Sequence, residues 1–239
     1  GSVLEIVYKD EPQQTELISY PLRDRLPDPI RTIPTELRYL QKLSPNYNGN
    51  IWAKCEHQNP TGCFKDRGSY IEVLKAKELK RDAICLASTG NMAASVACYA
   101  SYFGIKCYVF VPEFTSEGKL AQAMIHGSTI IQIKGNFDDG MQLVKDVAEF
   151  APVSIVNSIN PYRLQGQKTA AFEIIEELGH APDYHCLPVG NAGNITAHCM
   201  GYTEYHEMGK SDSTPIMLGY QAEGAAPFIK GSRVDKPET

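Results

Sequence analysis

From residue 65 onward, continuous apolar runs alternate with segments whose apolar residues recur every three or four positions. The apolar runs have the length of buried strands and cover residues 83–87, 106–111, 129–133 and 153–156. The segments of helical period cover residues 66–80, 92–103, 117–126 and 137–150. Strands that are apolar on both faces are typical of a parallel sheet with helices packed on either side. This part of the chain is therefore predicted to form a doubly wound α/β unit.

A second alternation follows the Asn- and Pro-rich segment 157–161, which is a natural boundary. It predicts helices over 163–178 and 195–208 and strands over 184–189 and 216–221. We therefore expect an α/β fold with two doubly wound, mostly parallel sheets. The predicted smaller domain covers 60–157, and the predicted larger domain combines 1–59 with 158–239. Right-handed crossovers would place the strand-to-helix turns at one edge of each sheet, where such folds hold their ligands.

The first fifty residues carry a weaker pattern, because several prolines interrupt any long periodic element. A strand is predicted at 4–8, and a second strand at 51–55. A short helix is predicted at 36–40, since Thr35 is a plausible N-terminal cap and Leu37 and Leu40 would share one face.

Composition and charge narrow the possible functions. The chain has 239 residues and a net charge of −5, and no basic run with interleaved aromatic residues, which argues against a nucleic-acid partner. No apolar stretch is long enough to cross a bilayer, and no signal pattern precedes the first strand. We expect no membrane association and a cytoplasmic location, or an organelle stroma in a eukaryote.

The seven cysteines and six histidines show no ligand spacing. The cysteines never occur as a Cys-x-x-Cys pair, and several lie in apolar runs, which is typical of buried thiols in a reducing compartment. We therefore expect no metal site.

Lys65 follows a turn that contains Asn59, Pro60 and Gly62 and precedes a helical pattern. At a helix entrance, desolvation and the positive end of the helix both favour the neutral amine. A neutral amine is the form that a Schiff base requires. The alternative is a solvated lysine near a helix start.

The turn 190–194, with the sequence Gly-Asn-Ala-Gly-Asn, lies between an apolar strand and an amphipathic helix. Two glycines let the backbone curl closely around an anion, and the N–H groups at the helix start point toward it. The sequence is neither a Walker loop nor a Gly-x-Gly-x-x-Gly turn. It is a candidate phosphate cradle, and the alternative is a Gly-rich turn without a ligand.

Two further groups of polar residues follow strand ends. Ser88, Thr89, Gly90 and Asn91 precede a helix, where a capping role for Ser88 or Thr89 is the ordinary explanation and binding of a carboxylate or a polar ring edge is the other. The second group combines an amide, a hydroxyl and a guanidinium, from Asn157, Ser158 and Arg163. Arg163 could hold a phosphate or carboxylate with two hydrogen bonds, or form a surface ion pair with Glu173 or a neighbour.

Six sequence strings occur in the order that resembles the threonine synthases, which are fold-type II pyridoxal-phosphate enzymes. They are Asn-Pro-Thr-Gly-Cys-Phe-Lys-Asp-Arg-Gly at 59–68, Ser-Thr-Gly-Asn at 88–91, Gly-Asn-Phe-Asp-Asp at 135–139, Asn-Ser-Ile-Asn-Pro-Tyr-Arg at 157–163, Gly-Gln-Lys-Thr-Ala-Ala-Phe-Glu at 166–173 and Gly-Asn-Ala-Gly-Asn at 190–194. The resemblance covers about three quarters of the chain. Cysteine synthases and serine/threonine dehydratases usually carry different Gly-rich strings at the last position.

The resemblance implies pyridoxal 5'-phosphate as the cofactor and assigns a role to each candidate residue. Lys65 would be the Schiff-base lysine, and Asn91 would contact the ring hydroxyl. The cofactor phosphate would be held by Gly190, Asn191, Ala192, Gly193 and Asn194. Ser88 and Thr89 would bind the carboxylate of the substrate, and its phosphate would be bound by Asn157, Ser158 and Arg163.

The reaction implied is the conversion of O-phospho-L-homoserine and water to L-threonine and phosphate, by a homodimer. The family continues past the region that matches Thr239, so we expect the C-terminal part of the fold to be missing from this sequence. Two alternatives stay open. One is a serine or threonine dehydratase, and the other is a non-catalytic truncated relative that binds a phosphorylated small molecule.

Overall fold

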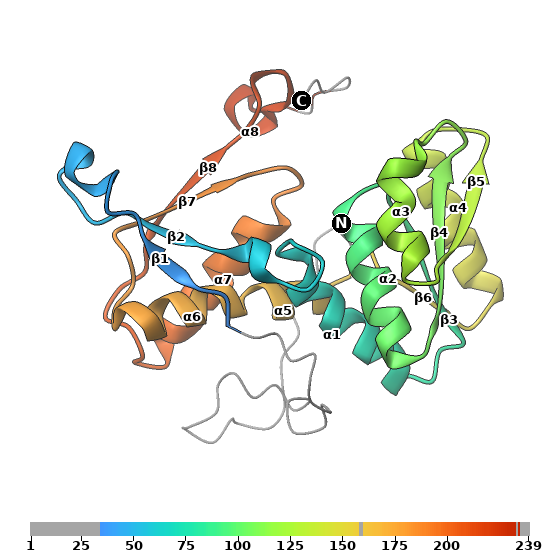
Figure 1. The fold of residues 1–239 in the computed structure, drawn as a ribbon, viewed down its shortest axis with the longest axis horizontal. Helices are drawn as coiled ribbons and strands as arrows, with labels where there is room; N and C mark the ends of the chain where they lie inside the picture. The colour runs from blue at the N-terminus through green and yellow to red at the C-terminus, as the bar shows by residue number, and fades with distance from the viewer. Residues whose placement is uncertain (1–33, 158–159, 233, 235–239) are drawn as a thin grey trace.

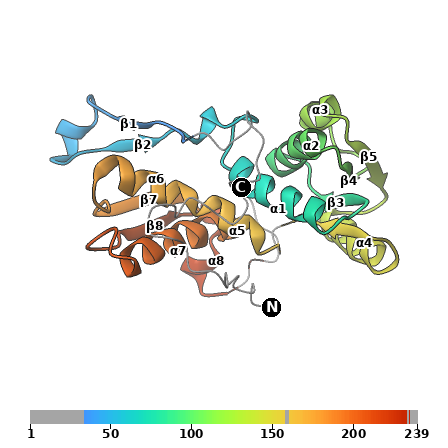
Figure 2. The same ribbon diagram turned by 90° about the horizontal axis from the view of Figure 1, so that it is seen from below.

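The computed structural model describes residues 34–157, 160–232 and 234. The predicted strand at 4–8 and the candidate residue Ser158 lie outside the described residues. The chain forms two lobes, with helix α1 (Lys65–Glu78) and helix α5 (Tyr162–Gln167) between them (Figures 1 and 2). No helix in the described ranges combines the length and apolar content that a membrane crossing requires.

One lobe is built on a parallel four-stranded sheet with the strand order β5-β4-β3-β6. Its strands are β3 (Ala83–Ala87), β4 (Lys106–Pro112), β5 (Thr129–Ile133) and β6 (Val153–Ile155). Its helices are α2 (Asn91–Phe103), α3 (Glu117–Ile125) and α4 (Phe137–Phe150). The sheet lies between α4 on one face and α1, α2 and α3 on the other (Figure 2).

Successive residues of β3 enter two different cores. Ile84 and Leu86 pack with α1 and α2, whereas Cys85 and Ala87 pack with Val144 of α4. All five residues of the strand are therefore buried, which explains why it is apolar throughout. The predicted α/β class with a parallel sheet is confirmed, and the predictions for β3, β5 and α4 agree with the structure residue for residue.

The other lobe contains a parallel pair of strands and an antiparallel pair. The parallel pair is β7 (Tyr184–Pro188) with β8 (Ile216–Tyr220), and the antiparallel pair is β1 (Leu37–Tyr39) with β2 (Trp52–Lys54). Helices α6 (Thr169–Leu178) and α7 (Gly193–Glu207) pack together through the stacked rings of Phe172 and Tyr205, whose centroids are 4.1 Å apart. The short helices are η2 (Ser44–Tyr47), η3 (Glu56–Gln58), η4 (Glu223–Ala225) and α8 (Pro227–Lys230).

The structure corrects two of the predicted elements. The helix predicted at 36–40 is wrong, because Leu37–Tyr39 pairs with β2 and the rings of Tyr39 and Trp52 lie 4.9 Å apart. The helix predicted at 163–178 is divided into α5 and α6, and the hydroxyl of Thr169 donates to the carbonyl of Gly166 at 2.7 Å. Such a bond from a threonine hydroxyl to the preceding turn competes with regular helix geometry. The predicted division into domains at 59/60 and 157/158 stays a prediction.

Helices α1 and α5 approach each other closely because glycines lie at their contact. A Cβ atom placed on Gly166 would lie 1.8 Å from the carbonyl oxygen of Arg67, and one on Gly68 would lie 2.7 Å from Arg163 Cγ. Neither position tolerates a side chain without a shift of the helices, and the shift at Gly166 involves the backbone.

We expect Gly166→Ala to lower the free energy of unfolding by about 1–3 kcal/mol, because the added methyl group forces α1 and α5 apart. Urea unfolding followed by circular dichroism measures this change. Gly118→Ala in α3 is the matched control, since no atom lies within 4 Å of a Cβ there and alanine favours a helix. Equal stabilities of the two variants would contradict close packing at Gly166.

Candidate functional site

Lys65 is the first residue of α1, and the side chain of its neighbour Asp66 fixes the turn before it. Asp66 accepts hydrogen bonds from the backbone N–H of Thr61 at 2.7 Å and from its hydroxyl at 2.6 Å. It also accepts one from the hydroxyl of Ser95 in α2, at 2.5 Å. The predicted turn and helix entrance are thus tied to each other and to α2.

A buried ionic cluster attaches the same helix start to the other lobe. Arg67 is 1% exposed and donates to the carboxylates of Glu173 and Glu56. Lys54 of β2 also contacts Glu173, at 2.6 Å. Burial by itself would lower the pKa of Arg67, but the hydrogen bonds with Glu173 and Glu56 outweigh it and raise that pKa. The guanidinium is therefore a permanent charge that links α1, α6, β2 and η3.

The amine of Lys65 lies in a partly buried environment beside another cation. Burial lowers its pKa, and the positive charge of Arg163 lowers it further, against weaker opposite effects of Cys63 and Glu72. Its Nζ lies 4.8 Å from the centroid of the Phe64 ring. A lower pKa means that a larger fraction of the amine is neutral at a given pH, which is the form that reacts with a carbonyl group.

The Gly-rich turn enters α7 through an unusual backbone conformation. Ala192 precedes the helix with φ of 63°, in the left-handed region that alanine rarely adopts. The side-chain oxygen of Asn191 accepts from the N–H of Gly193 at 3.1 Å. The N–H groups of the first helical turn have no acceptor within the helix. These groups could receive an anion, and the role of the turn as a phosphate cradle stays a prediction.

Arg163 brings α5 to this turn. A Cβ atom placed on Gly193 would lie 2.6 Å from both Nη1 and Nη2 of Arg163, so the guanidinium lies directly against the turn. Arg163 is 3% exposed, so it is not a surface residue. The predicted alternative of a surface ion pair with Glu173 is therefore wrong. Glu173 instead binds Arg67 and Lys54 inside the molecule. The structure therefore connects α1 with the Gly-rich turn through Arg163, which contacts Gly68 at one end and Gly193 at the other.

The segment Ser88 to Asn91 follows β3 directly. Asn157 fixes the end of this strand, since its amide donates to the carbonyl of Ala87 at 3.1 Å and accepts from its N–H at 3.3 Å. The first role of Asn157 is thus to position the turn, and its contact with a substrate phosphate stays a prediction. Helix α2 has Gly90 as its N-terminal cap, with no side-chain hydrogen bond, so capping by Ser88 or Thr89 is wrong. Asn91 is exposed.

Two histidines that the sequence analysis did not assign to the site lie near the Gly-rich turn, the buried His198 and the partly buried His185. His198 Nδ1 is 2.9 Å from the carbonyl oxygen of Asn194, and His185 Nδ1 is 2.7 Å from the hydroxyl of Tyr202. Burial, and then the neighbouring His198, lower the pKa of His185 to about 3. The ring of His198 thus contacts the turn directly, and the ring of His185 packs against His198 with its centroid 4.7 Å away. The sequence feature that could have identified His198 is its position, one helical turn after Asn194, the last residue of the Gly-rich string.

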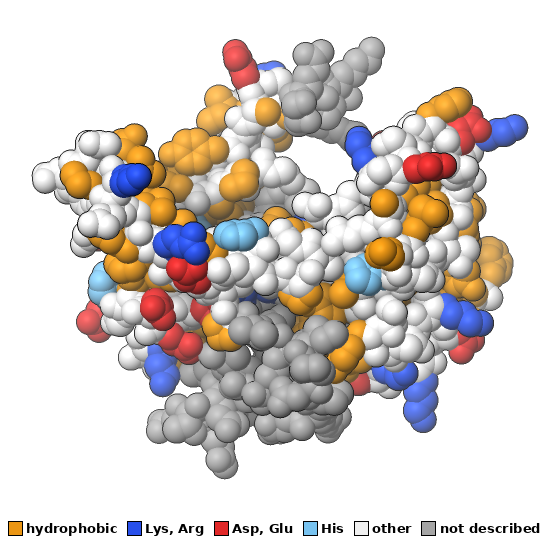
Figure 3. Space-filling model, viewed as in Figure 1, with side chains coloured by type: hydrophobic (Ala, Val, Ile, Leu, Met, Phe, Trp, Pro, Cys, Tyr) orange, Lys and Arg blue, Asp and Glu red, His pale blue; other side chains and the backbone are white. Residues whose placement is uncertain are grey.

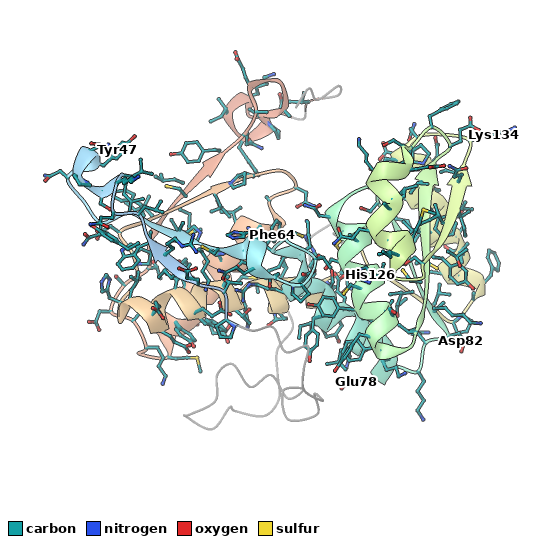
Figure 4. The ribbon with its side chains drawn as sticks, in the orientation of Figure 1. Tyr47, Phe64, Glu78, Asp82, His126 and Lys134 are labelled. Carbon is teal, nitrogen blue, oxygen red and sulfur yellow. The ribbon has the colours of Figure 1, made fainter. Side chains whose placement is uncertain are left out.

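The surface between the two lobes is recessed. Figure 3 shows a hollow between the two lobes, and Figure 4 places Phe64, the residue before Lys65, between the same lobes.

Within the described residues, no group of three or more His, Cys, Asp or Glu side chains is placed to hold a metal ion.

Comparison with known protein families identifies the chemistry that this arrangement serves. The family described as pyridoxal-phosphate dependent enzyme matches residues 31–239. The chain is 52% identical over 190 residues to the threonine synthase of Synechocystis sp., which covers 79% of this chain and 50% of that protein. It is 51% identical over 226 residues to the threonine synthase of Mycobacterium tuberculosis, with 91% and 63% covered. It thus spans about half to three fifths of these curated relatives.

Solved structures show the same fold at lower sequence identity. Threonine deaminase isoform 2 from Solanum lycopersicum superposes with a TM-score of 0.75 at 23% identity, over 87% of this chain and 57% of that chain. Maize serine racemase gives a TM-score of 0.73 at 21% identity, over 87% and 63%. These similarities cover most of the chain and show the α/β architecture of the fold-type II enzymes.

The residues present fit a pyridoxal phosphate group. The amine of Lys65 has a lowered pKa, the N–H groups at the start of α7 can receive a phosphate, and only glycine leaves room for the Arg163 guanidinium at position 193. These groups come from three different helices, α1, α5 and α7. The match over residues 31–239 and this fit agree, and the chain therefore belongs to the family of pyridoxal-phosphate dependent enzymes.

Proposed function

We propose that the protein carrying this chain is a lyase of the threonine synthase type, which converts O-phospho-L-homoserine and water to L-threonine and phosphate. The proposal is supported by relatives named threonine synthase that are 40–52% identical to this chain. The observation that carries it is the contact of the Arg163 guanidinium with Gly193 of the Gly-rich turn, together with the effect of its charge on the amine of Lys65. The proposal concerns the whole protein. The sequence covers the part that contains Lys65, Arg163 and the Gly-rich turn.

The cofactor would be held at three points. Lys65 would bind it covalently through its amine, the backbone N–H groups of the turn from Gly190 to Asn194 would hold its phosphate, and Asn91 would contact its ring hydroxyl. When bound, the pyridoxal ring supplies an electron sink for the bonds that the substrate breaks. The burial that lowers the pKa of Lys65 would also limit the access of water to the bond between Lys65 and the cofactor.

The substrate would be bound by residues from both lobes. The partly exposed hydroxyls of Ser88 and Thr89 would bind its carboxylate. Arg163, together with Asn157 and Ser158, would bind its phosphate, because a guanidinium offers two parallel N–H donors to such an anion. Lys65 would then move protons at Cα, Cβ and Cγ of the substrate as phosphate leaves and water adds at Cβ. Assembly as a homodimer stays a prediction.

Turnover of O-phospho-L-homoserine by the full-length protein tests this proposal. After addition of pyridoxal 5'-phosphate, we expect a visible absorption band, an increased intact mass after borohydride reduction, and equal amounts of phosphate and threonine. Release of a keto acid and ammonia would instead indicate a dehydratase. A protein that stays colourless and inactive with added cofactor would indicate a non-catalytic binding protein.

A further inference from the structure

Glu72 is a buried carboxyl group that the proposed reaction does not use. It lies in α1, seven positions after Lys65 and four after Gly68, which puts these three residues on one face of the helix. Its side chain is 1% exposed, and neither of its carboxyl oxygens has a hydrogen-bond partner among the described residues. A buried carboxyl group without hydrogen bonds is uncommon and calls for a physical explanation.

Two cations act on this carboxyl group, Arg163 from α5 and Lys65 from α1. The effect is mutual, since the charge of Glu72 also raises the pKa of Arg163 and of Lys65. Helix α2 and strand β3 also pack on α1, but within the described residues they add no charged group to this pair. The charge of Glu72 therefore depends on two residues that both belong to the candidate site.

The polar groups near Glu72 do not hold its ionised form. The amide of Gln167 lies against Gly68, with Nε2 at 3.1 Å from a Cβ atom placed there, and neither of its polar atoms has a partner among the described residues. The hydroxyl of Ser69 is likewise buried without one. Hydrogen bonds would favour the carboxylate, and among the described residues the two cations are the groups that oppose the cost of burial. Burial prevails and raises the pKa of Glu72 well above its usual range.

An anion at the Gly-rich turn changes this balance. Arg163 runs from Gly68 to Gly193, so its guanidinium lies between the surroundings of Glu72 and the turn. An anion beside Arg163 offsets its positive charge and removes part of the stabilisation of the Glu72 carboxylate. The protonated form of Glu72 is then favoured over a wider range of pH.

We propose that Glu72 takes up a proton when an anion binds beside Arg163, so that occupancy of the phosphate site is linked to a buried proton. The inference rests on the proposed function only for the assignment of an anion to Arg163, which there binds the phosphate of the substrate beside the turn that holds the phosphate of the cofactor. Glu72 is in this view a positioning residue that acts through Arg163 and Lys65. Anion affinity falls as the pH rises through the range in which Glu72 ionises in the free protein, because the proton must then be supplied from solution.

The direct test is the titration of Glu72 by carboxyl carbon NMR, on the 239-residue chain with and without sulfate. Sulfate is chosen because it does not titrate in the range of the experiment. We expect the pKa of Glu72 to be higher in saturating sulfate, with shifted amide signals from Gly190 to Asn194. We also expect the sulfate affinity to fall by up to about tenfold per pH unit above the free-state pKa of Glu72, as for one linked proton.

Glu72→Gln should remove this pH dependence, because glutamine has a similar shape and does not titrate. Glu149→Gln is the matched control, since Glu149 is exposed on α4, and it should retain the full pH dependence. The titration of the unmodified chain decides the proposal even if Glu72→Gln fails to fold. A pKa of Glu72 that is unchanged by bound sulfate would overturn the linkage alone and leave the anion site intact. Unshifted amide signals at the turn would overturn the anion site as well, and neither result touches the cofactor bond to Lys65.

Discussion

Lys65→Ala is expected to abolish covalent retention of pyridoxal 5'-phosphate and to lower kcat by on the order of 10³-fold or more. The variant lacks the amine at the start of α1, whose pKa is lowered by burial and by the charge of Arg163, the residue that contacts the Gly-rich turn. It removes both the covalent attachment and the group that moves protons, so the two losses should occur together. The measurements are visible absorbance with added cofactor, intact mass after reduction, and release of phosphate from phosphohomoserine.

A second lysine provides the control for this variant. Lys119 is exposed on α3, and Lys119→Ala should retain the absorption band and the turnover of the unmodified protein. The phosphate-binding turn is intact in Lys65→Ala, so weak non-covalent cofactor binding should remain. A variant that lacks Lys65 and still gains the cofactor mass after reduction would refute the assignment of this amine.

Arg67→Met is expected to lower the free energy of unfolding by about 3–5 kcal/mol. The substitution removes the guanidinium that both Glu56 and Glu173 contact. Glu173 retains its contact with Lys54, whereas Glu56 loses its ion-pair partner among the described residues. A buried carboxylate without its cation must be protonated or hydrated, and either change costs free energy. Urea unfolding monitored by tryptophan fluorescence reports this loss, because Trp52 is the single tryptophan and lies in β2 next to the cluster residue Lys54.

The exposed pair between Arg38 and Glu36 is the control for this substitution. Its side chains are 55% and 42% exposed, so water already solvates both charges and Arg38→Met should leave stability unchanged within error. Lowering the pH should reduce the difference between Arg67→Met and the unmodified chain, because hydrogen bonds with Arg67 lower the pKa of Glu56 against the effect of burial. Its contribution to stability is present above the unfolded pKa and is lost as the pH falls through the folded value. An unstable Arg38→Met together with a stable Arg67→Met would contradict the role of the cluster.

The sequence determined the regular part of the fold and indicated the candidate residues of the site. Strand β3 is predicted correctly because both of its faces are buried, so every position is apolar and the pattern is local. The Gly-rich turn and Lys65 could be found for the same reason, since a strand-to-helix turn and a helix entrance are recognised from neighbouring residues alone. That these two segments belong to one site could be expected from the resemblance to known enzymes.

Only the tertiary structure decided the contacts between residues far apart in the chain. Segment 36–40 has a helical pattern but forms strand β1, because pairing with β2 outweighs a weak local preference. Asn157 binds the backbone of Ala87, and Glu72 lies in an apolar helix face beside two cations, which no local pattern reveals. Charges and hydrogen bonds act between groups that folding brings together, so their partners are set by the packing of α1 against α5, and not by spacing along the sequence.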